Sequence, residues 1–413
     1  ALAGNTKHRV VCIGDAANLK GRLPVHPNIE LYVYDALKTG PAKSHHYVSG
    51  FEAQIRRGQD VARVALALQQ KGFDPDIVVA HPGWGEALFL KDVFVHAKHI
   101  HYFEFYYRSI GADVNFDPEF PSTVDDLFKL RIRNSAQLHA LTSGDVGVSP
   151  TQWQKSQYPA EFERKIQVAH EGVDTELVCP NNAASFQVGT HVFKAGQEII
   201  TYVARNLEPY RGLHVFMRSL PKLLAQRPHA HVLIVGGDEV SYGRRLPREQ
   251  TYRAFYTNQL KDQLDWSRVH FLGKLPYRNY LQVLQVSAAH VYLTYPFVLS
   301  WSCIEAMSMG ALVIGSKTSP VEEAITHGKN GLLVDFFDHE ALAQTVVKVL
   351  NNPEKYQHLR DAARKTAIER YDLKSVCLPQ QMKMINDLVN GRKPKTPGAT
   401  ELKRFEDVIW KSK

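Results

Sequence analysis

Short apolar runs alternate with amphipathic helical patterns along this chain, and the alternation occurs twice. In the first third, the predicted strands span residues 8–14, 29–35, 76–86, 99–107 and 144–150, and the predicted helices span residues 50–72 and 125–141. Strands that alternate with helices indicate βαβ units around a parallel sheet. The first third therefore predicts an α/β domain whose ligands bind at the carboxyl ends of its strands.

A second alternation follows a polar, turn-rich stretch at residues 179–197, which suits a connection between two domains. Its predicted strands span residues 198–206, 230–239, 268–275, 288–296 and 311–316, and a predicted helix spans residues 212–228. A chain of 413 residues is too long for one ordinary core. We predict two doubly wound, Rossmann-like domains, the first over residues 1–172 and the second over residues 173–375.

The charge and cysteine content limit the classes of partner and compartment. The formal net charge is +8, which fits an anionic partner such as a nucleoside diphosphate or a lipid surface, and equally a basic surface without a role. No arginine-rich block or nucleic-acid motif accompanies the charge, so no nucleic-acid partner is predicted. The four cysteines show no paired spacing. No apolar run approaches the ~18 residues of a membrane span, and a cytoplasmic location is expected.

The segment 294–316 is the strongest candidate for a binding site. A strand ends at Pro296, a loop follows, Ser302 is the predicted N-cap, and Glu305 is expected in the first turn of the next helix. The amides of a helix N-terminus suit a diphosphate, and a carboxylate there can accept hydrogen bonds from two ribose hydroxyls. The alternative is a glutamate that only complements the helix dipole.

Two further strand ends carry candidate ligand-binding residues. Arg205 lies at the end of the predicted strand 198–206 and Arg211 in the loop after it, where two guanidinium groups suit a phosphate clamp, although solvated surface arginines remain the alternative. Gly237 ends another strand, and a glycine there permits close approach of a ligand to the backbone.

In the first third, His81 and Glu104 lie at predicted strand ends. They would position an acceptor hydroxyl or stabilise positive charge on a sugar. The alternative for His81 is a turn histidine bonded to backbone. Glu104 is flanked by aromatic residues and needs a partner, either Arg108 or a ligand, because an unpaired buried carboxylate is costly. The histidines at 96, 99 and 101 lack an added carboxylate or cysteine at useful spacing, so no metal site is predicted.

The stretch 300–316 resembles the E-x7-E segment of the retaining, GT-B-fold glycosyltransferases of family four, and the resemblance covers nearly the whole chain. Glu305 matches the second glutamate, which in the family binds the ribose. Phe297 stands where the family has its first glutamate, which contacts the donor sugar. Arg205 and Arg211 match the family's diphosphate-binding pair. Glu104 stands at the sequence position that best matches a histidine found in several members of the family.

The resemblance implies two Rossmann-like domains that face a cleft. It also implies a C-terminal helix within residues 376–413 that returns toward the first domain before a basic tail, and a first strand that would precede Ala1. The implied catalytic residues are His81, Glu104, Arg205 and Arg211. The implied donor-binding residues are Arg205, Arg211, Gly237, Lys274, Leu275, Leu299, Ser300, Trp301, Ser302 and Glu305.

The implied reaction moves a sugar from a UDP- or GDP-type donor to a hydroxyl of a glycan, lipid-linked or small-molecule acceptor, with retention and without a metal. Another reaction of a nucleotide-sugar on the same scaffold is one alternative. A non-catalytic scaffold derived from a transferase is another, motivated by Phe297. Arginines at 56, 57 and 63, and cations at 129, 131 and 133, further suggest peripheral contact with an anionic membrane, against the alternative of solvated helix faces.

Overall fold

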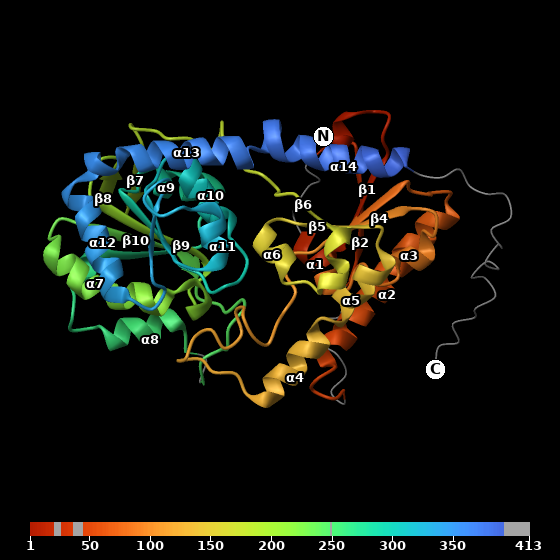
Figure 1. Ribbon diagram of the computed structural model, residues 1–413, viewed down its shortest axis with the longest axis horizontal. Helices are drawn as coiled ribbons and strands as arrows, with labels where there is room; N and C mark the ends of the chain where they lie inside the picture. The colour runs from red at the N-terminus through yellow and green to blue at the C-terminus, as the bar shows by residue number, and fades with distance from the viewer. Residues whose placement is uncertain (20–25, 36–43, 248–249, 392–413) are drawn as a thin grey trace.

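The computed structural model describes residues 1–19, 26–35, 44–247 and 250–391, and these residues form two α/β domains side by side (Figure 1). The predicted α/β class is confirmed. The basic tail, which lies from residue 392 onward, falls outside the described residues.

The N-terminal domain contains two parallel sheets. β1 (Val10–Asp15) pairs with β2 (Ile29–Tyr34), and a second sheet has the order β3 (Ile77–Ala80), β4 (Lys98–Tyr102), β5 (Val146–Ser149) and β6 (Ile166–Val168). The helices and 3₁₀ turns of this domain are η1 (Leu2–Gly4), α1 (Ala16–Leu19), α2 (Ser49–Gln70), η2 (Pro82–Trp84), α3 (Leu90–Val93), α4 (Val124–Arg133), α5 (Ser135–Ser143), α6 (Gln152–Ser156) and η3 (Ala160–Lys165). α2 buries Val61, Ala65 and Leu68 at helical spacing, which explains the amphipathic pattern.

The C-terminal domain is built on one six-stranded parallel sheet. Its order is β11 (Val269–Gly273), β10 (His231–Gly237), β9 (Ile199–Asn206), β12 (Ala289–Tyr292), β13 (Val313–Ser316) and β14 (Leu332–Val334). Its helices and 3₁₀ turns are η4 (Pro209–Arg211), α7 (Leu213–Gln226), α8 (Tyr252–Gln259), η6 (Trp266–Arg268), α9 (Tyr277–Gln285), α10 (Trp301–Ser308), α11 (Ser319–Ala324), α12 (His339–Asn351), η7 (Pro353–Tyr356) and α13 (Gln357–Tyr371). β9 is the first of these strands in the chain, so the strand order reverses between β9 and β12.

The stretch 179–197, expected as an irregular connection, instead forms an antiparallel hairpin of β7 (Ser185–Val188) and β8 (His191–Lys194). Phe186 and Phe193 are cross-strand partners and are both buried. They pack with Val283 and Val286 of the C-terminal domain. Tertiary packing of these two aromatic rings, which the polar surroundings concealed, stabilises the hairpin.

Two elements of the N-terminal domain differ from the sequence pattern, because one strand ends early and one helix is divided. The strand predicted over residues 99–107 stops at Tyr102, and the helix predicted over residues 125–141 divides at Asn134 into α4 and α5. The Asn134 side chain accepts a hydrogen bond from the Tyr107 amide at 3.1 Å and donates one to the Tyr107 carbonyl at 2.8 Å. The break between the helices therefore holds the segment that leaves the sheet.

Residues 103–123, which connect β4 to α4, pack against the other domain. Phe105 is buried in the main core of the C-terminal domain, and Phe116 and Phe120 pack against the same core. Asp117 accepts a hydrogen bond from the Tyr295 hydroxyl at 2.6 Å. We call residues 103–123 the interdomain segment, because it joins the two domains through apolar and polar contacts.

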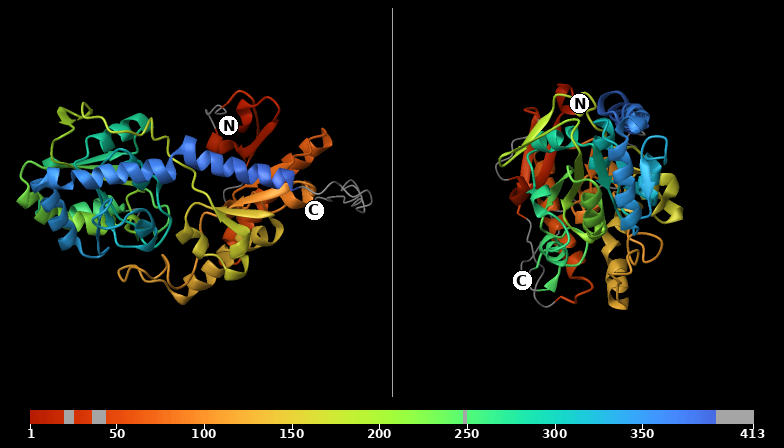
Figure 2. Two further views of the ribbon diagram at one scale, coloured as in Figure 1. Left: turned by 45° about the horizontal axis from the view of Figure 1, so that its top comes forward. Right: turned by 90° about the vertical axis from the view of Figure 1, so that its left-hand side faces the viewer.

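The C-terminal end of the described chain crosses back between the domains. α13 covers the C-terminal domain, η8 (Leu373–Cys377) follows, and α14 (Leu378–Asn390) lies along the N-terminal domain (Figures 1 and 2). Met384 of α14 packs with Ile100 and Val148. At the crossing, Asp372 accepts a hydrogen bond from the Thr175 hydroxyl at 2.6 Å, which joins the two passages of the chain between the domains.

Candidate active site

The reversal of strand order places two loops side by side at one edge of the C-terminal sheet. β9 ends at Asn206 and leads into η4, and β12 ends at Tyr292 and leads into the loop that precedes α10. In open parallel sheets, ligands bind outside the carboxyl ends of the strands at such a reversal. Gly212 begins α7 there with a φ of 69°, and a Cβ at this position would lie 2.5 Å from Leu293. Only glycine therefore fits where these two loops meet.

The two arginines of the predicted phosphate clamp have different environments. Arg205 is exposed, and it forms no hydrogen bond or ion pair with the described residues. Arg211 is 7% exposed, and its Nη1 donates to the Thr294 hydroxyl at 2.8 Å and to the Val298 carbonyl at 3.0 Å. Arg205 is thus available to a ligand, whereas Arg211 holds the loop after β12 from beneath.

The loop before α10 is anchored at its last residue. The Ser300 amide donates to the Tyr292 hydroxyl at 2.7 Å, and the Ser300 hydroxyl caps α10 by accepting from the Ser302 amide at 3.4 Å. The N-cap is therefore Ser300, and the prediction of Ser302 is wrong. Because α10 begins at Trp301, Glu305 lies in its second turn instead of the first. Trp301 is 58% exposed, and its indole donates to Glu171 at 3.2 Å.

Glu305 is buried, and two tyrosines hold its carboxylate. The Tyr277 hydroxyl donates to Oε1 at 2.7 Å, and the Tyr280 hydroxyl donates to Oε2 at 2.6 Å. Burial and the neighbouring carboxylate raise the pKa of both phenols, so they remain donors. Each carboxylate oxygen keeps a second lone pair for a ligand hydroxyl. The prediction overlooked these tyrosines, although their three-residue spacing on α9 is visible in the sequence.

Of the remaining predicted donor-binding residues, Gly237 ends β10, Lys274 and Leu275 follow β11, and Leu299 lies in the loop before α10. A Cβ at Gly237 would lie 2.4 Å from the Lys274 side chain and 2.6 Å from Asn206 Oδ1. The glycine thus allows Lys274 to cross the strand end and pair with Glu239, with 2.7 Å between Nζ and Oε2. Leu275 and Leu299 both pack in the core under α10, so their side chains are structural and only their backbone faces remain for a ligand.

Phe297, at the position of the family's first glutamate, belongs to an aromatic cluster. Its ring centroid is 4.6 Å from that of Phe105, 4.8 Å from that of Tyr242 and 5.6 Å from that of Tyr210. The Trp153 indole donates to the Phe297 carbonyl at 2.9 Å. Phe297 therefore contacts residues of both domains.

On the N-terminal side of the cleft, His81 and Glu104 contact each other. His81 Nδ1 accepts from the Gly83 amide at 3.2 Å, so its Nε2 carries the proton toward Glu104 Oε2 at 3.3 Å. The histidine is thus both a turn residue and the partner of Glu104. Arg108, proposed as that partner, does not contact Glu104 in the described structure.

The charges of the two domains act on Glu104 across the cleft. Burial raises the pKa of Glu104, but the hydrogen bond from His81 and the charges of His81, Arg211 and Arg205 outweigh it and lower the pKa overall. Glu104 is therefore an ionised carboxylate opposite two guanidinium groups. Arg205 and Arg211 of the C-terminal domain thus lie near enough to Glu104 for their charges to lower its pKa.

Histidines and carboxylates also gather away from this site. His99 and His101 are buried in β4, and His99 Nε2 bonds to the Phe94 carbonyl at 3.2 Å. Within the described ranges, one group of three side chains has the spacing of metal ligands, namely Asp117, Glu119 and His214. Protein groups already occupy it, because Arg218 binds Glu119 and Tyr295 binds Asp117. This group joins the interdomain segment to α7.

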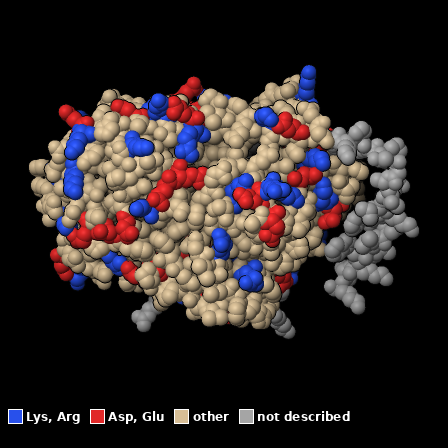
Figure 3. Space-filling view, in the orientation of Figure 1, with Lys and Arg blue, Asp and Glu red and all other residues tan. Residues whose placement is uncertain are grey.

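The basic helix faces considered for membrane contact are largely paired. Arg56 binds Glu52, Arg63 binds Asp60, and Lys129 binds Asp125. On the face in Figure 3, positive and negative side chains are interspersed. Among the described residues, no helix has the length and apolar character to span a membrane.

Two family models match the chain in succession. The model described as Glycosyl transferase family 4 group matches residues 6–178, and the model described as Glycosyl transferases group 1 matches residues 186–366. Their junction falls just before the β7–β8 hairpin, where the N-terminal domain gives way to the C-terminal one.

Curated relatives match part of the chain. D-inositol 3-phosphate glycosyltransferase of Corynebacterium efficiens is 26% identical over 201 residues, which are 48% of this chain and 45% of the relative. Glycogen synthase of Mycobacterium tuberculosis is 24% identical over 212 residues, which are 51% of this chain and 46% of the relative. The chain thus spans about half the length of the curated relatives it matches.

Solved structures match nearly the whole chain. Sucrose-phosphate synthase from Thermosynechococcus elongatus has a TM-score of 0.66 at 18% identity, covering 89% of this chain and 85% of that one. HepE of Anabaena has a TM-score of 0.61 at 15% identity, covering 90% and 88%. These likenesses confirm the predicted GT-B architecture.

Proposed function

We propose, from the premise that the chain belongs to the group 1 and family 4 glycosyltransferases, that it transfers a sugar from a nucleoside diphosphate sugar to a hydroxyl acceptor. One observation carries the proposal. The exposed Arg205, the tyrosine-held Glu305 and the N-terminus of α10 lie around the reversal of strand order, where parallel sheets bind nucleotides.

The donor is proposed to bind along the C-terminal wall. Glu305 accepts hydrogen bonds from the ribose hydroxyls, Arg205 neutralises the diphosphate, and the N-terminus of α10 adds its dipole. The Trp301 amide is the proposed donor there, because the amides of Ser300 and Ser302 already bond to the Tyr292 and Ser300 hydroxyls. Arg211 is proposed as a positioning residue, because its contacts hold this loop. A uridine donor is the first to test, because HepE has been solved in complex with UDP and with UDP-glucose. A guanosine donor remains the second candidate.

Transfer is proposed to retain the anomeric configuration. The bond from the anomeric carbon to the diphosphate oxygen breaks, and the acceptor oxygen bonds to that carbon on the same face. The acceptor proton passes to the leaving diphosphate. Glu104, held by His81, stabilises the positive charge that develops on the sugar. Because cationic side chains and the helix dipole balance the leaving group, no metal is assigned to the step. The acceptor is proposed to be a glycan, a lipid-linked sugar or a small molecule.

The first test is nucleotide binding followed by turnover. UDP or GDP is expected to raise the melting temperature, and the matching sugar nucleotide is expected to release its diphosphate when acceptors are added. Arg205→Ala is expected to lower turnover by about 10²–10³-fold. The control Lys348→Ala removes an exposed cation of α12 and leaves turnover unchanged. Absence of any nucleotide binding or turnover by the intact protein would favour the non-catalytic scaffold.

The location is also part of the proposal. We place the protein in the cytoplasm. We also propose peripheral contact with anionic lipid through α2 and α4, which requires several of their cations to exchange a carboxylate partner for a lipid headgroup. Flotation with vesicles of phosphatidylserine and phosphatidylcholine tests this contact. Equal recovery with neutral vesicles alone would reject the electrostatic attachment.

A further inference from the structure

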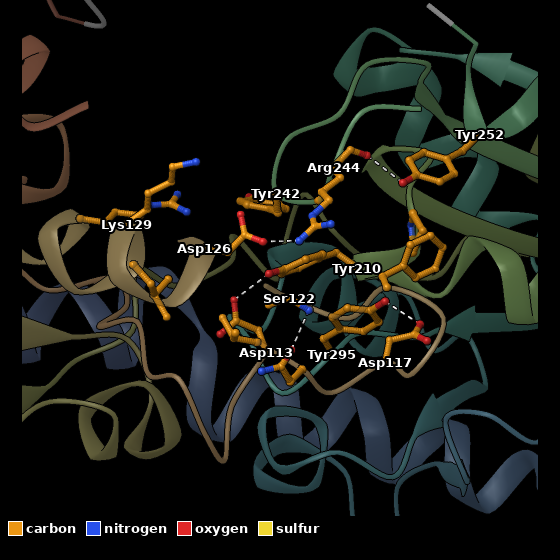
Figure 4. Close-up of a pocket in the computed structure, with 17 residues that line it drawn as sticks. Asp113, Asp117, Ser122, Asp126, Lys129, Tyr210, Tyr242, Arg244, Tyr252 and Tyr295 are labelled. Carbon is orange, nitrogen blue, oxygen red and sulfur yellow. Dashed lines mark hydrogen bonds and ion pairs between the residues drawn. The ribbon is translucent and has the colours of Figure 1, made fainter. Parts of the chain in front are cut away.

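A pocket of about 250 Å³ lies between the domains (Figure 4). The interdomain segment and α4 form one side, and the loops that follow β9, β10 and β12 form the other. None of the residues proposed above for the donor or for catalysis lines it. The ring of Tyr242, which lines the pocket, packs 4.8 Å from Phe297, so a layer of side chains separates the pocket from the proposed donor site.

Asp113 lines this pocket with an incomplete set of hydrogen bonds. The residue is only 2% exposed, and its Oδ2 accepts a hydrogen bond from the Tyr210 hydroxyl at 2.9 Å. Its Oδ1 is buried without a hydrogen-bond partner of normal geometry among the described residues. The amides of Asp113 and Val114 lie close enough to lower its pKa, but burial dominates and raises that pKa to about 6. A buried oxygen of this kind is costly unless a ligand or water donates to it.

Side chains that can donate hydrogen bonds also line this pocket. Arg133 lies over the Tyr107 ring at 3.9 Å and forms no hydrogen bond or ion pair with the described chain. The Tyr242 hydroxyl is likewise without a partner among the described residues, although its backbone is fixed by Glu208, whose carboxylate accepts from the amides of Ser241, Tyr242 and Gly243. The pocket thus offers a free acceptor and free donors on a fixed wall.

The charges of the lining cancel. Three carboxylates, of Asp113, Asp117 and Asp126, are matched by the cations of Lys129, Arg133 and Arg244. Four tyrosines add aromatic surface. Balanced charge selects neither anions nor cations, hydroxyl groups use donors and acceptors together, and tyrosine rings cover the apolar C–H face of a ring. The volume lies just below the roughly 300–1,000 Å³ of pockets for drug-sized ligands, which suits one small ring.

We propose that this pocket binds one neutral saccharide unit of the acceptor, at a distance from the point of transfer. The inference rests on the proposed function, because it names the acceptor of that transfer as a glycan. Asp113 Oδ1 accepts from a sugar hydroxyl, and Arg133 donates to another. The tyrosines pack against the ring.

The test uses the intact protein with saturating UDP, so that the donor site is filled. Maltose, cellobiose, lactose and diacetylchitobiose are the probes, and saturation-transfer NMR and calorimetry measure binding. At least one disaccharide is expected to bind with a millimolar Kd. Arg133→Ala and the near-isosteric Asp113→Asn are expected to weaken it at least about tenfold, which is 1.4 kcal/mol. The matched control Arg131→Ala, on the same helix but outside the pocket lining, is expected to bind like the wild type.

The outcomes separate this inference from the proposed function. UDP binding without binding of any disaccharide, or disaccharide binding that neither pocket variant weakens, overturns the inference and leaves the transferase proposal standing. Displacement of the sugar by inorganic phosphate or spermidine overturns it as well, because the site would then be ionic. Sugar binding that both variants weaken, in a protein that never turns over a donor, supports the pocket and rejects catalysis.

Discussion

On the C-terminal side of the cleft, Glu305 is 9% exposed and two tyrosine hydroxyls hold its carboxylate, whereas on the N-terminal side the Glu104 side chain is 46% exposed and contacts one histidine. The strands that lead to them differ in the same direction, since β12 is buried throughout, whereas β4 is buried only at its three central positions. The donor wall is therefore preorganised, while the opposite wall has room to adapt to its ligand.

The strongest test of the rigid wall is removal of Arg211. Arg211→Ala leaves the buried acceptors of Thr294 and Val298 without a donor, so we expect the free energy of unfolding to fall by about 3–5 kcal/mol. Urea denaturation followed by tryptophan fluorescence measures it. Arg205→Ala, which removes an exposed arginine of the same clamp, is expected to stay within about 0.5 kcal/mol of the wild type. Equal stability of the two variants would contradict the assignment of different roles.

Asp113 of the interdomain segment makes the free energy of unfolding depend on pH. Burial raises the pKa of Asp113 to about 6, against an ordinary value of 3.8. The folded state therefore binds a proton more tightly than the unfolded state, and this contribution to stability is present below about pH 4 and lost as the pH rises through 6. The loss is at most about 3 kcal/mol. Tyr210, which donates to Asp113, and the nearby Arg133 limit it.

Asp113→Asn removes this titration. The difference in unfolding free energy between the wild type and the variant is expected to fall between pH 4 and pH 6 and to be flat on either side. Denaturation at several pH values measures that difference and cancels the other titrating groups. A flat difference across the whole range would mean that Asp113 is hydrated. Its Oδ1 would then already have a hydrogen-bond donor and would not be the unpaired acceptor of the pocket.

The architecture was predictable because it follows from local patterns. Apolar runs marked the strands, and the carboxyl ends of those strands marked Arg205 and Glu305. The burial of Arg211 was not predictable, since its partners Thr294 and Val298 lie 83 and 87 residues away in the chain. The first five residues of the interdomain segment, 103–107, were mistaken for a continuing strand because aromatic residues among them pack on another domain. Local pattern thus located the site, and long-range packing decided which of its residues are free.

On the adaptable wall, Glu104→Gln is expected to lower turnover by about 10²-fold without changing the Kd for UDP. The substitution keeps the size of the side chain but removes the negative charge proposed to stabilise the sugar in the transition state. Single-turnover kinetics and calorimetry with UDP measure the two quantities. Glu163→Gln, an exposed substitution in the same domain, is the control. A weaker Kd for UDP would place Glu104 on the donor wall and remove the contrast between the two sides.

Glu305→Gln is expected to have the smallest effect, and the effect should be on binding. A neutral amide accepts hydrogen bonds from ribose hydroxyls more weakly than a carboxylate, so the Kd for UDP should rise about tenfold. One amide oxygen still accepts from Tyr277 or Tyr280, while the amide nitrogen faces the other hydroxyl. Titration with UDP and with uracil separates ribose recognition from base recognition. Glu369→Gln, exposed on α13, is the control. An unchanged affinity for UDP would show that the two tyrosines already use the carboxylate fully, so that Glu305 is as structural as Arg211 and the nucleotide is held by Arg205 and the amides of α10.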